Sequence, residues 1–465
     1  MEYDSPAPKL SDLSRKTRDC SEFYSFESQI RTCGTRLEQA APGANEDAWP
    51  SRRAMVSVKI LFLAHRIPFP PDKGEKIRAY QELRFLSSRH TVDLFAFADQ
   101  AEQSAGRAAL SAICNEVHLL ALSRNASRAR ASLSLLSGQP FTTAYFYSAR
   151  MAKLVREATA RNNYDVIFVY CSAMAPYVAH CPPAMLCIDF VDSDASKWEQ
   201  YARYAAFPMS TIYKREARKL GEYEKELAQR ARLSLVSTPL EIEAIDPDGK
   251  FGVRALQNGV AKPAPPSAVP PPQIASLGKY VVFVGQMDYL PNVDAASFFA
   301  KDILPKIRKS HAALQFAIVG RNPSPRVLEL AKLPGVSVIG AVPEVQPYLE
   351  NAVAAVAPFR ICQGVQNKIL EALAIGLPVV ATPRPARAVG ATSSELLFVA
   401  HTPEEFARVV IQVLETQPLR GRGKEFIQEH FDWERNLEPL DRWLLEVPVA
   451  SQPTREETRN YVTAV

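Results

Sequence analysis

The sequence lacks a long apolar run. No stretch approaches the ~18 consecutive apolar residues that a membrane-spanning helix needs, and the N-terminus has no signal-peptide pattern. These absences predict a cytoplasmic protein, with peripheral contact at the inner face of the cell membrane left open. The net charge is only +5 for 465 residues, and no module of interleaved basic and aromatic residues appears. Nucleic acid is therefore not expected among its partners.

Ordered cysteine spacing is missing too. The seven cysteines are an odd number and lie scattered along the chain, and Cys181 and Cys187 lack the spacing of a zinc site. We therefore expect buried free thiols in a reducing compartment.

What is present is an alternation of short apolar runs with helical patterns. A length of 465 residues and 47% hydrophobic residues predict two or three domains with sizeable cores. Strands are expected at residues 58–64, 92–96, 116–120, 166–170, 185–191 and 233–237, then at 280–284, 315–319, 337–339, 354–357, 379–381 and 397–399. Helices between them would cover two parallel sheets on both faces, so the predicted fold is α/β with two doubly wound, Rossmann-like domains.

Composition sets the predicted domain limits. The polar, irregular start predicts disorder before Met55, which could be the true start of the chain. The proline-rich segment 262–278 is read as a linker without regular structure. The predicted divisions are a disordered extension at 1–54, an N-terminal domain at 55–261, the linker at 262–278, a C-terminal domain at 279–430, a final helix at 431–447 and a disordered tail at 448–465.

The most informative segment is 358–380, which predicts a strand, a basic turn, a helix of about 365–375 and a second strand. Arg360 and Lys368 flank the turn, where a helix N-terminus attracts anions. Glu371 lies three residues after Lys368 on the same helix face, free to accept hydrogen bonds from hydroxyl groups. A nucleotide-sugar presents phosphates beside a sugar diol, so this segment could bind one. A salt-bridged surface βαβ unit explains the segment alone equally well.

Further loops follow neighbouring strands of the second domain. In doubly wound sheets ligands bind at the carboxyl ends of the strands, and glycine there allows a ligand to approach the backbone closely. Each such loop is a weak signal alone, but together they favour a ligand site. The candidate residues are Gly285, Gly320, Arg321, Gly340 and Val345.

The pattern Arg-x₇-Lys-x₂-Glu-Ala-Leu-Ala-x-Gly-x-Pro-Val-Val resembles the nucleotide-sugar domain of GT-B-fold glycosyltransferases, specifically family 4. The resemblance extends over about residues 55–446. It implies two domains facing across a cleft, with a C-terminal helix that returns to the first domain. It also implies that Arg360 and Lys368 contact the donor diphosphate and Glu371 the ribose. Gln363 stands where family members commonly carry a sugar-contacting glutamate, so Gln363 or the adjacent Gly364 is expected to hold the transferred sugar.

In the first domain the loop that begins at His65 follows the first strand. It resembles the glycine loop of this family, in which Gly74 would lie against the donor phosphate and the acceptor. His65, Arg66 and Arg78 are the other expected acceptor-side residues of this loop, although strand-end capping and a simple turn also explain it. With the segment 190–198, the loop most resembles sugar transferases of bacterial exosortase-associated exopolysaccharide loci.

Asp192-Ser193-Asp194 could bind a metal ion, as in GT-A enzymes. We instead expect no metal and no cofactor, with Asp192 facing the acceptor, because the phosphate-binding pattern lies in a second domain. Family members often have a histidine after the strand 166–170, where this chain has Cys171-Ser172. A retaining enzyme of this fold is thought to need no strong base, since the departing phosphate can accept the proton of the acceptor.

The sequence therefore predicts a retaining, metal-independent hexosyltransferase that uses a nucleotide-diphosphate sugar. Its acceptor would be a polysaccharide or a lipid-linked oligosaccharide. A nucleotide-sugar 2-epimerase of the same fold and a non-catalytic nucleotide-sugar-binding protein are the alternatives. A cationic cluster on the helix 211–231, formed by Lys214, Arg215, Arg218 and Lys219, could touch an anionic membrane, although a solvated helix face is the simpler explanation.

Overall fold

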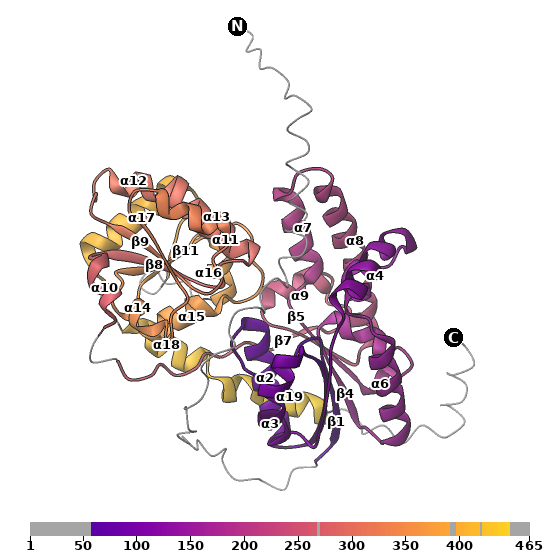
Figure 1. Cartoon of the computed structure of the whole chain (residues 1–465). Helices are drawn as coiled ribbons and strands as arrows, with labels where there is room; N and C mark the ends of the chain where they lie inside the picture. Colours follow the sequence, from indigo (N-terminus) through magenta and orange to yellow (C-terminus); the bar gives the residue numbers. More distant parts are fainter. Residues whose placement is uncertain (1–56, 267–269, 391–396, 419–420, 447–465) are drawn as a thin grey trace, which may run out of the picture. The chain divides into compact units, whose positions relative to one another are not determined.

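The computed structural model describes residues 57–266, 270–390, 397–418 and 421–446 (Figure 1). The predicted disorder of 1–54 and 448–465, and the question of a start at Met55, fall outside these residues. Contacts divide the chain into two compact units. The first unit includes Pro266–Arg360 and Thr402–Gln417, and the second includes the described parts of Ala48–Pro265, Ile361–His401 and Pro418–Val465.

The first sheet has seven parallel strands in the order β3-β2-β1-β4-β5-β6-β7. Its strands are β1 (Lys59–Ala64), β2 (Thr91–Phe97), β3 (Glu116–Leu120), β4 (Val166–Tyr170), β5 (Leu186–Val191), β6 (Leu233–Val236) and β7 (Arg254–Ala255). The central strands are buried on both faces, which explains their continuous apolar sequences.

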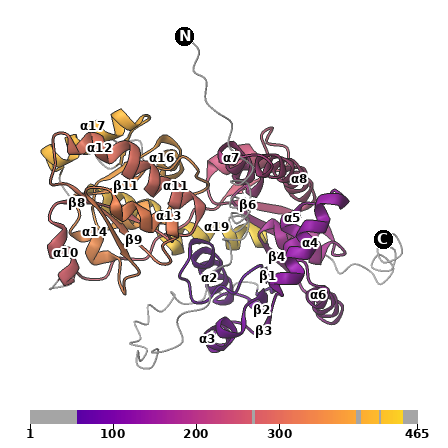
Figure 2. The ribbon, with the colours of Figure 1, turned by 45° about the horizontal axis from the view of Figure 1, so that its top comes forward.

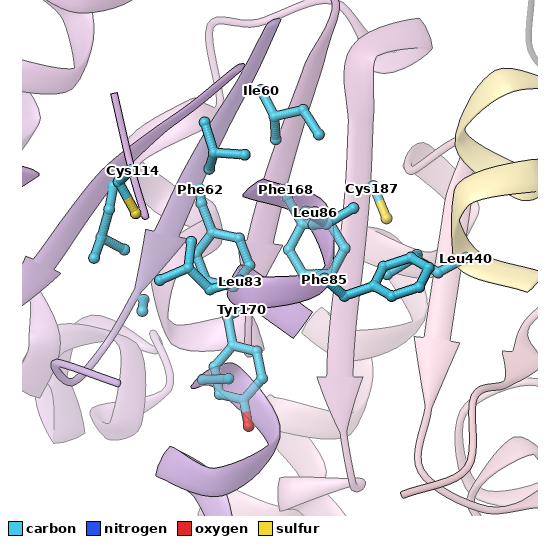
Figure 3. Close-up of a cluster of buried hydrophobic side chains, with 14 of the residues drawn as sticks. Ile60, Phe62, Leu83, Phe85, Leu86, Cys114, Phe168, Tyr170, Cys187 and Leu440 are labelled. Atoms are coloured by element: carbon cyan, nitrogen blue, oxygen red, sulfur yellow. The ribbon is translucent and has the colours of Figure 1, made fainter. Parts of the chain in front are cut away.

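Helices cover both faces of this sheet (Figures 1 and 2). One core joins alternate residues of β1, such as Ile60 and Phe62, to helix α2 and the C-terminal helix α19 (Figure 3). The other core joins Leu61 and Leu63 to α6 and α8. These helices are α2 (Gly74–Ser87), α6 (Ala149–Arg161), α8 (Met209–Arg230) and α19 (Trp433–Leu445), with α3 (Gln100–Ser111), α4 (Arg124–Ser137), α5 (Phe141–Phe146), α7 (Asp194–Tyr204), α9 (Pro239–Ile245), and the 3₁₀ helices Ser172–Val178 and Pro183–Met185 completing this part.

The second sheet has six strands in the order β10-β9-β8-β11-β12-β13. They are β8 (Tyr280–Val284), β9 (Gln315–Val319), β10 (Val336–Gly340), β11 (Ala354–Ala357), β12 (Val379–Ala381) and β13 (Leu397–Val399). The accompanying helices are α10 (Pro272–Leu277), α11 (Leu290–Phe298), α12 (Leu304–Arg308), α13 (Pro325–Leu328), α14 (Gln346–Glu350), α15 (Asn367–Ala374), α16 (Pro383–Val389), α17 (Pro403–Thr416) and α18 (Arg422–His430), with a π-helical turn at Phe299–Ile303 and a 3₁₀ turn at Glu329–Lys332.

All twelve predicted strands are confirmed, each to within one residue at both ends. One prediction was wrong: the segment 262–278 is not free of regular structure, because α10 forms at Pro272–Leu277. Proline is tolerated in the first turn of a helix, where its missing N–H has no partner to lose. The strand β7 was not predicted, since two residues give no period.

The C-terminal helix α19 packs on the core of the first sheet, as the predicted fold class requires. Trp433, Leu437, Leu440 and Leu444 of α19 are buried in the same core as Ile60 and Phe62, and Leu440 is visible beside Phe85 in Figure 3. Among the described residues, no helix has both the length and the apolar character needed to cross a membrane.

Candidate active site

Three glycine-bearing loops meet at the carboxyl ends of β8, β9 and β10. The Gly320 N–H donates to the Gly340 carbonyl at 2.8 Å, and the Gly285 N–H donates to the Val319 carbonyl at 3.1 Å. Gly320 has a φ of +153°, and a Cβ atom there would lie 1.6 Å from the Gly285 carbonyl oxygen. Only glycine fits such an approach. The Arg321 carbonyl joins the same loops by accepting a hydrogen bond from the Met287 N–H at 2.9 Å.

Arg360 lies in the first unit, three residues after β11. Its guanidinium forms a two-pronged ion pair with Asp294 of α11, in which Nε donates to Oδ2 at 3.0 Å and Nη2 donates to Oδ1. The group also stacks on the Phe298 ring, 4.6 Å from its centroid. The Arg360 side chain keeps about a third of its surface exposed, so it is oriented by Asp294 and still accessible to an anion.

Lys368 and Glu371 lie on α15, in the second unit. Burial lowers the pKa of Lys368 to about 7, although the Glu371 carboxylate acts in the opposite direction. Burial also raises the pKa of Glu371, with Lys368 opposing the shift. The two groups therefore stand as a poorly solvated pair of opposite charge. An anion near Lys368 would restore its proton affinity.

The turn between Arg360 and α15, residues 361–366, is held by side chains of the second unit. We call it the Gln363 turn. The Cys362 N–H donates to Gln200 Oε1 at 2.8 Å, and the Gly364 N–H donates to Glu241 Oε1 at 3.2 Å. The Gln363 carboxamide donates to the Ser193 carbonyl at 3.4 Å and accepts from Arg384 of α16.

Gly364 has a φ of +55°, and a Cβ atom there would lie 2.1 Å from Asp192 Oδ1. Both facts require glycine at this position. The structure thus brings the predicted donor-side residues Gln363 and Gly364 together with the predicted acceptor-side residue Asp192.

Asp192 follows β5 and accepts a hydrogen bond from the Ser237 hydroxyl at 2.6 Å. Burial, reinforced by the Glu241 carboxylate, raises its pKa to about 7. The preceding residue, Val191, has a φ of +66°, which is strained for a β-branched side chain and is found where the surrounding structure imposes it. Asp192 is thus a half-buried carboxyl group that follows a strained strand end.

The second aspartate of the Asp-Ser-Asp sequence has a different partner. Asp194 forms an ion pair with Lys197 at 3.1 Å. Within the described ranges, no group of three or more His, Cys, Asp or Glu side chains could hold a metal ion. Independence from metals remains a prediction.

His65 lies at the end of β1 beside Cys171 at the end of β4. The two side chains are 3.2 Å apart, from Nδ1 to Sγ, and the imidazole stacks on Tyr170 and meets Phe146 edge to face. Burial lowers the pKa of His65 to about 3, so the ring is neutral. Cys171 has a φ of +68°, a second strained residue at the same edge of the sheet. This partner for His65 was not predicted.

Arg66 and Gly74 are the other predicted site residues of this loop. Arg66 follows His65 and is half-buried. Gly74 is the first residue of α2, and a Cβ atom there would lie 3.9 Å from Asn367 Nδ2 at the start of α15. An alanine at position 74 would therefore fit, in ordinary van der Waals contact with α15. The assignments of Gly74 and Arg66 stay predictions.

Arg78 is buried inside a polar network. Its guanidinium pairs with Asp189 at 2.7 Å and Glu82 at 3.0 Å and donates to the Leu256 carbonyl and Asn258 Oδ1. Burial, reinforced by Asp189, raises the pKa of Glu82 well above its usual range. These partners fix the chain that leaves β7, so the geometry favours a structural part for Arg78, and its contact with the acceptor stays a prediction.

The cationic cluster on α8 has internal partners. Arg215 donates to the carbonyls of Ser134 and Gln139, near the end of α4. Arg218 and Lys219 both pair with Glu222. This pattern agrees with the simpler explanation, a solvated helix face.

Several residues of the site were not predicted from the sequence, above all Glu241, Arg384, Ser193 and Gln200. Each contacts the Gln363 turn from a segment far away in the sequence. The only available signal was position: Ser193 lies two residues after β5, and Glu241 lies in the first turn of the helix that follows β6, near the carboxyl ends of strands where such sheets bind ligands.

Comparisons with known proteins give the same fold. Residues 278–416 match the family model described as "Glycosyl transferases group 1". This segment contains Gly285, Gly320, Arg360, Lys368 and Glu371. A search of curated proteins gave no significant match.

Solved structures similar to this chain include HepE from Anabaena, in complex with UDP and glucose, with 16% identity, a TM-score of 0.56, and coverage of 83% of this chain and 99% of HepE. Sucrose-phosphate synthase from Thermosynechococcus elongatus has 14% identity and a TM-score of 0.60, with coverage of 85% of this chain and 100% of the synthase. WaaG, a glycosyltransferase involved in lipopolysaccharide biosynthesis, has 15% identity and a TM-score of 0.55, with coverage of 83% of this chain and 99% of WaaG. The chain therefore has the GT-B fold of two Rossmann-like domains.

Proposed function

We propose that this chain is a glycosyltransferase of the GT-B fold that uses a nucleotide-diphosphate sugar as its donor. The observation that carries the proposal is the Lys368–Glu371 pair on α15, which lies within the segment that matches the group 1 glycosyltransferase model. A cation at the start of a helix, with a carboxylate one turn further, complements a diphosphate joined to a ribose. The complexes of HepE with UDP and with UDP-glucose support the same class of donor.

In this proposal Lys368 and Arg360 stabilise the departing diphosphate. Negative charge grows on the leaving group in the transition state, so fixed cations contribute more to turnover than to donor binding. The Asp294 carboxylate keeps the Arg360 guanidinium in one orientation before the donor arrives. Positioning and charge stabilisation would then supply most of the catalysis.

Glu371 would accept hydrogen bonds from the ribose hydroxyls, and Gln363 would contact the transferred sugar. We further propose transfer with retention of configuration and without a metal ion. The acceptor oxygen attacks from the face that the diphosphate leaves, and a departing phosphate oxygen takes its proton. The neutral His65 ring and the Asp192 carboxyl group then serve the acceptor as hydrogen-bond partners, and no strong base is required.

The further details of the donor and the acceptor come from the resemblance to a known family. A hexose donor, family 4 membership, and a polysaccharide or lipid-linked acceptor of exopolysaccharide synthesis rest on the sequence resemblance. Peripheral contact with an anionic membrane remains part of the proposal, although the internal partners of Arg215, Arg218 and Lys219 reduce the charge available for it.

The test is product analysis without an acceptor. The protein is incubated with a panel of UDP-, GDP- and ADP-sugars, and proton NMR follows the anomeric signal of the released sugar. A retaining transferase should slowly release a nucleoside diphosphate and a sugar whose first-formed anomer matches the donor. Inversion at C2 of the sugar would indicate the epimerase. Binding of a donor without any release would indicate a non-catalytic protein.

A further inference from the structure

Glu241, on the first turn of α9, connects three separate segments of the second unit. Its side chain is almost completely buried, with 1% of its surface exposed. One carboxylate oxygen, Oε2, accepts the Ser193 N–H at 3.0 Å, and the other, Oε1, accepts the Gly364 N–H at 3.2 Å. Arg384 Nη2 lies 3.6 Å from Oε1. A single buried carboxylate therefore fixes the chain after β5, the Gln363 turn and α16 together.

The same segments determine how the Gln363 side chain points. Its amide nitrogen donates to the carbonyl of Ser193, and its amide oxygen accepts from Arg384. Ser193 is held further by its hydroxyl, which donates to the buried Glu224 at 2.9 Å. Both ends of the Gln363 carboxamide are thus attached to residues that Glu241 contacts directly.

We propose that Glu241 is the positioning residue for the sugar-contacting turn, acting through Gly364, Ser193 and Arg384 to fix Gln363 beside the transferred sugar. This inference rests on the proposed function, because it explains how Gln363 is held in the proposed donor site. Glu241 itself would act through these three contacts and would not touch the substrate.

The chemistry at this position requires a carboxylate. Both of its oxygens face backbone N–H groups, so both must accept. A glutamine of the same size would place an NH₂ group against one of the two N–H groups, and a buried donor would lose its partner. The turn would shift, while Lys368 and Glu371, further along on α15, would keep their places.

The experiment compares Glu241→Gln with Glu243→Gln, which alters an exposed carboxylate on the same helix. Turnover with the best donor is measured together with the affinities for the intact nucleotide-sugar and for the bare nucleoside diphosphate. We expect kcat of Glu241→Gln to fall about tenfold or more, a factor equal to 1.4 kcal/mol in the barrier. Its affinity for the nucleoside diphosphate should stay at the wild-type value, and Glu243→Gln should behave as wild type.

A double-mutant cycle tests whether Glu241 acts through Gln363. In a Gln363→Ala background, Glu241→Gln should cost little further turnover. Equal losses in both backgrounds would overturn the inference, as would an equal loss of affinity for the nucleotide-sugar and the nucleoside diphosphate, which indicates general damage to the fold.

Arg384→Gln, at a half-exposed side chain, covers the case in which Glu241→Gln does not fold. It should reproduce the selective loss of turnover at smaller size, and wild-type turnover in this variant would contradict the arrangement. If the unaltered protein turns over no nucleotide-sugar, the proposed function fails together with this inference. Wild-type turnover in Glu241→Gln would overturn the inference alone.

Discussion

At the scale of residues, burial shifts the pKa values of Lys368 and Glu371 in opposite directions. Removal from water disfavours the ionised form of both, so the pKa of Lys368 falls and the pKa of Glu371 rises. Their mutual attraction opposes both shifts. A bound diphosphate would add a second negative charge beside Lys368 and favour its protonated form.

The lowered pKa of Lys368 predicts a pH dependence of donor binding. Lys368 is cationic below about pH 7 and loses its charge as the pH rises through that value. A nucleotide-sugar keeps its two diphosphate charges throughout the range from about pH 6 to 8.5. Its affinity for the protein should therefore fall above about pH 7 because Lys368 loses its proton. Calorimetric titration at several pH values measures this slope.

Lys368→Arg is the control for this prediction, because the guanidinium stays charged at every pH tested. Its affinity should vary little over the same range. Parallel slopes for Lys368→Arg and wild type would show that another group causes the dependence.

At the scale of elements, the loops that follow β8 and β9 approach so closely that no side chain fits at Gly320. Gly320 and Gly340 both have positive φ angles, but they differ in space. A Cβ atom at Gly320 would collide with the Gly285 carbonyl, whereas nothing lies within 4 Å of one at Gly340. Substitutions at these two glycines therefore distinguish the effect of backbone strain from that of a steric clash.

Gly320→Ala should destabilise the protein more than Gly340→Ala. Both substitutions incur a conformational strain of about 1–3 kcal/mol, and only Gly320→Ala adds a clash with rigid backbone. Urea denaturation monitored by circular dichroism measures the two midpoints. Equal midpoints would mean that the loops move apart easily, and that their close approach does not limit the stability of the protein.

The strands, and the helix on which Lys368 and Glu371 share a face, could be predicted because their signals are local. Apolar runs such as 315–319 mark buried parallel strands, and the spacing of Lys368 and Glu371 places them on one face of a helix. Helix α10 escaped prediction because its prolines, read as a linker signal, occupy the first turn, where they are tolerated.

Glu241, Ser193 and Arg384 could not be predicted because their part depends on contacts with the Gln363 turn across long stretches of sequence. Nothing in Pro239-Leu240-Glu241 distinguishes a buried acceptor from an ordinary acid near a helix start. The same holds for Cys171, which lies beside His65 because β1 and β4 are neighbours in the sheet.

At the scale of the whole molecule, the last described helix completes the core of the first sheet. α19 lies after the strands of the second sheet in the sequence, yet its apolar face is buried with Ile60, Phe62 and Phe85 (Figure 3). A chain cut before α19 would leave this apolar surface exposed to water.

Leu440→Ala should lower the free energy of unfolding of this unit by about 2–5 kcal/mol, since Leu440 is fully buried and the lost side chain leaves a cavity. Glu438→Ala, at an exposed position of the same helix, should have almost no effect. The two thermal transitions, followed by calorimetry, measure the difference. Equal transitions would show that α19 contributes little to the core.

The central claim is that α15 carries the binding site for a nucleotide-sugar donor. The most direct test is calorimetric titration of a panel of UDP-, GDP- and ADP-sugars into wild type, Glu371→Gln and Glu438→Gln, the last an exposed control. One class of donor should bind wild type and Glu438→Gln alike, and bind Glu371→Gln more weakly by ~1.5–3 kcal/mol, the value of hydrogen bonds to a charged group. Equal affinity of folded Glu371→Gln and wild type, or no binding by any donor, would contradict the account.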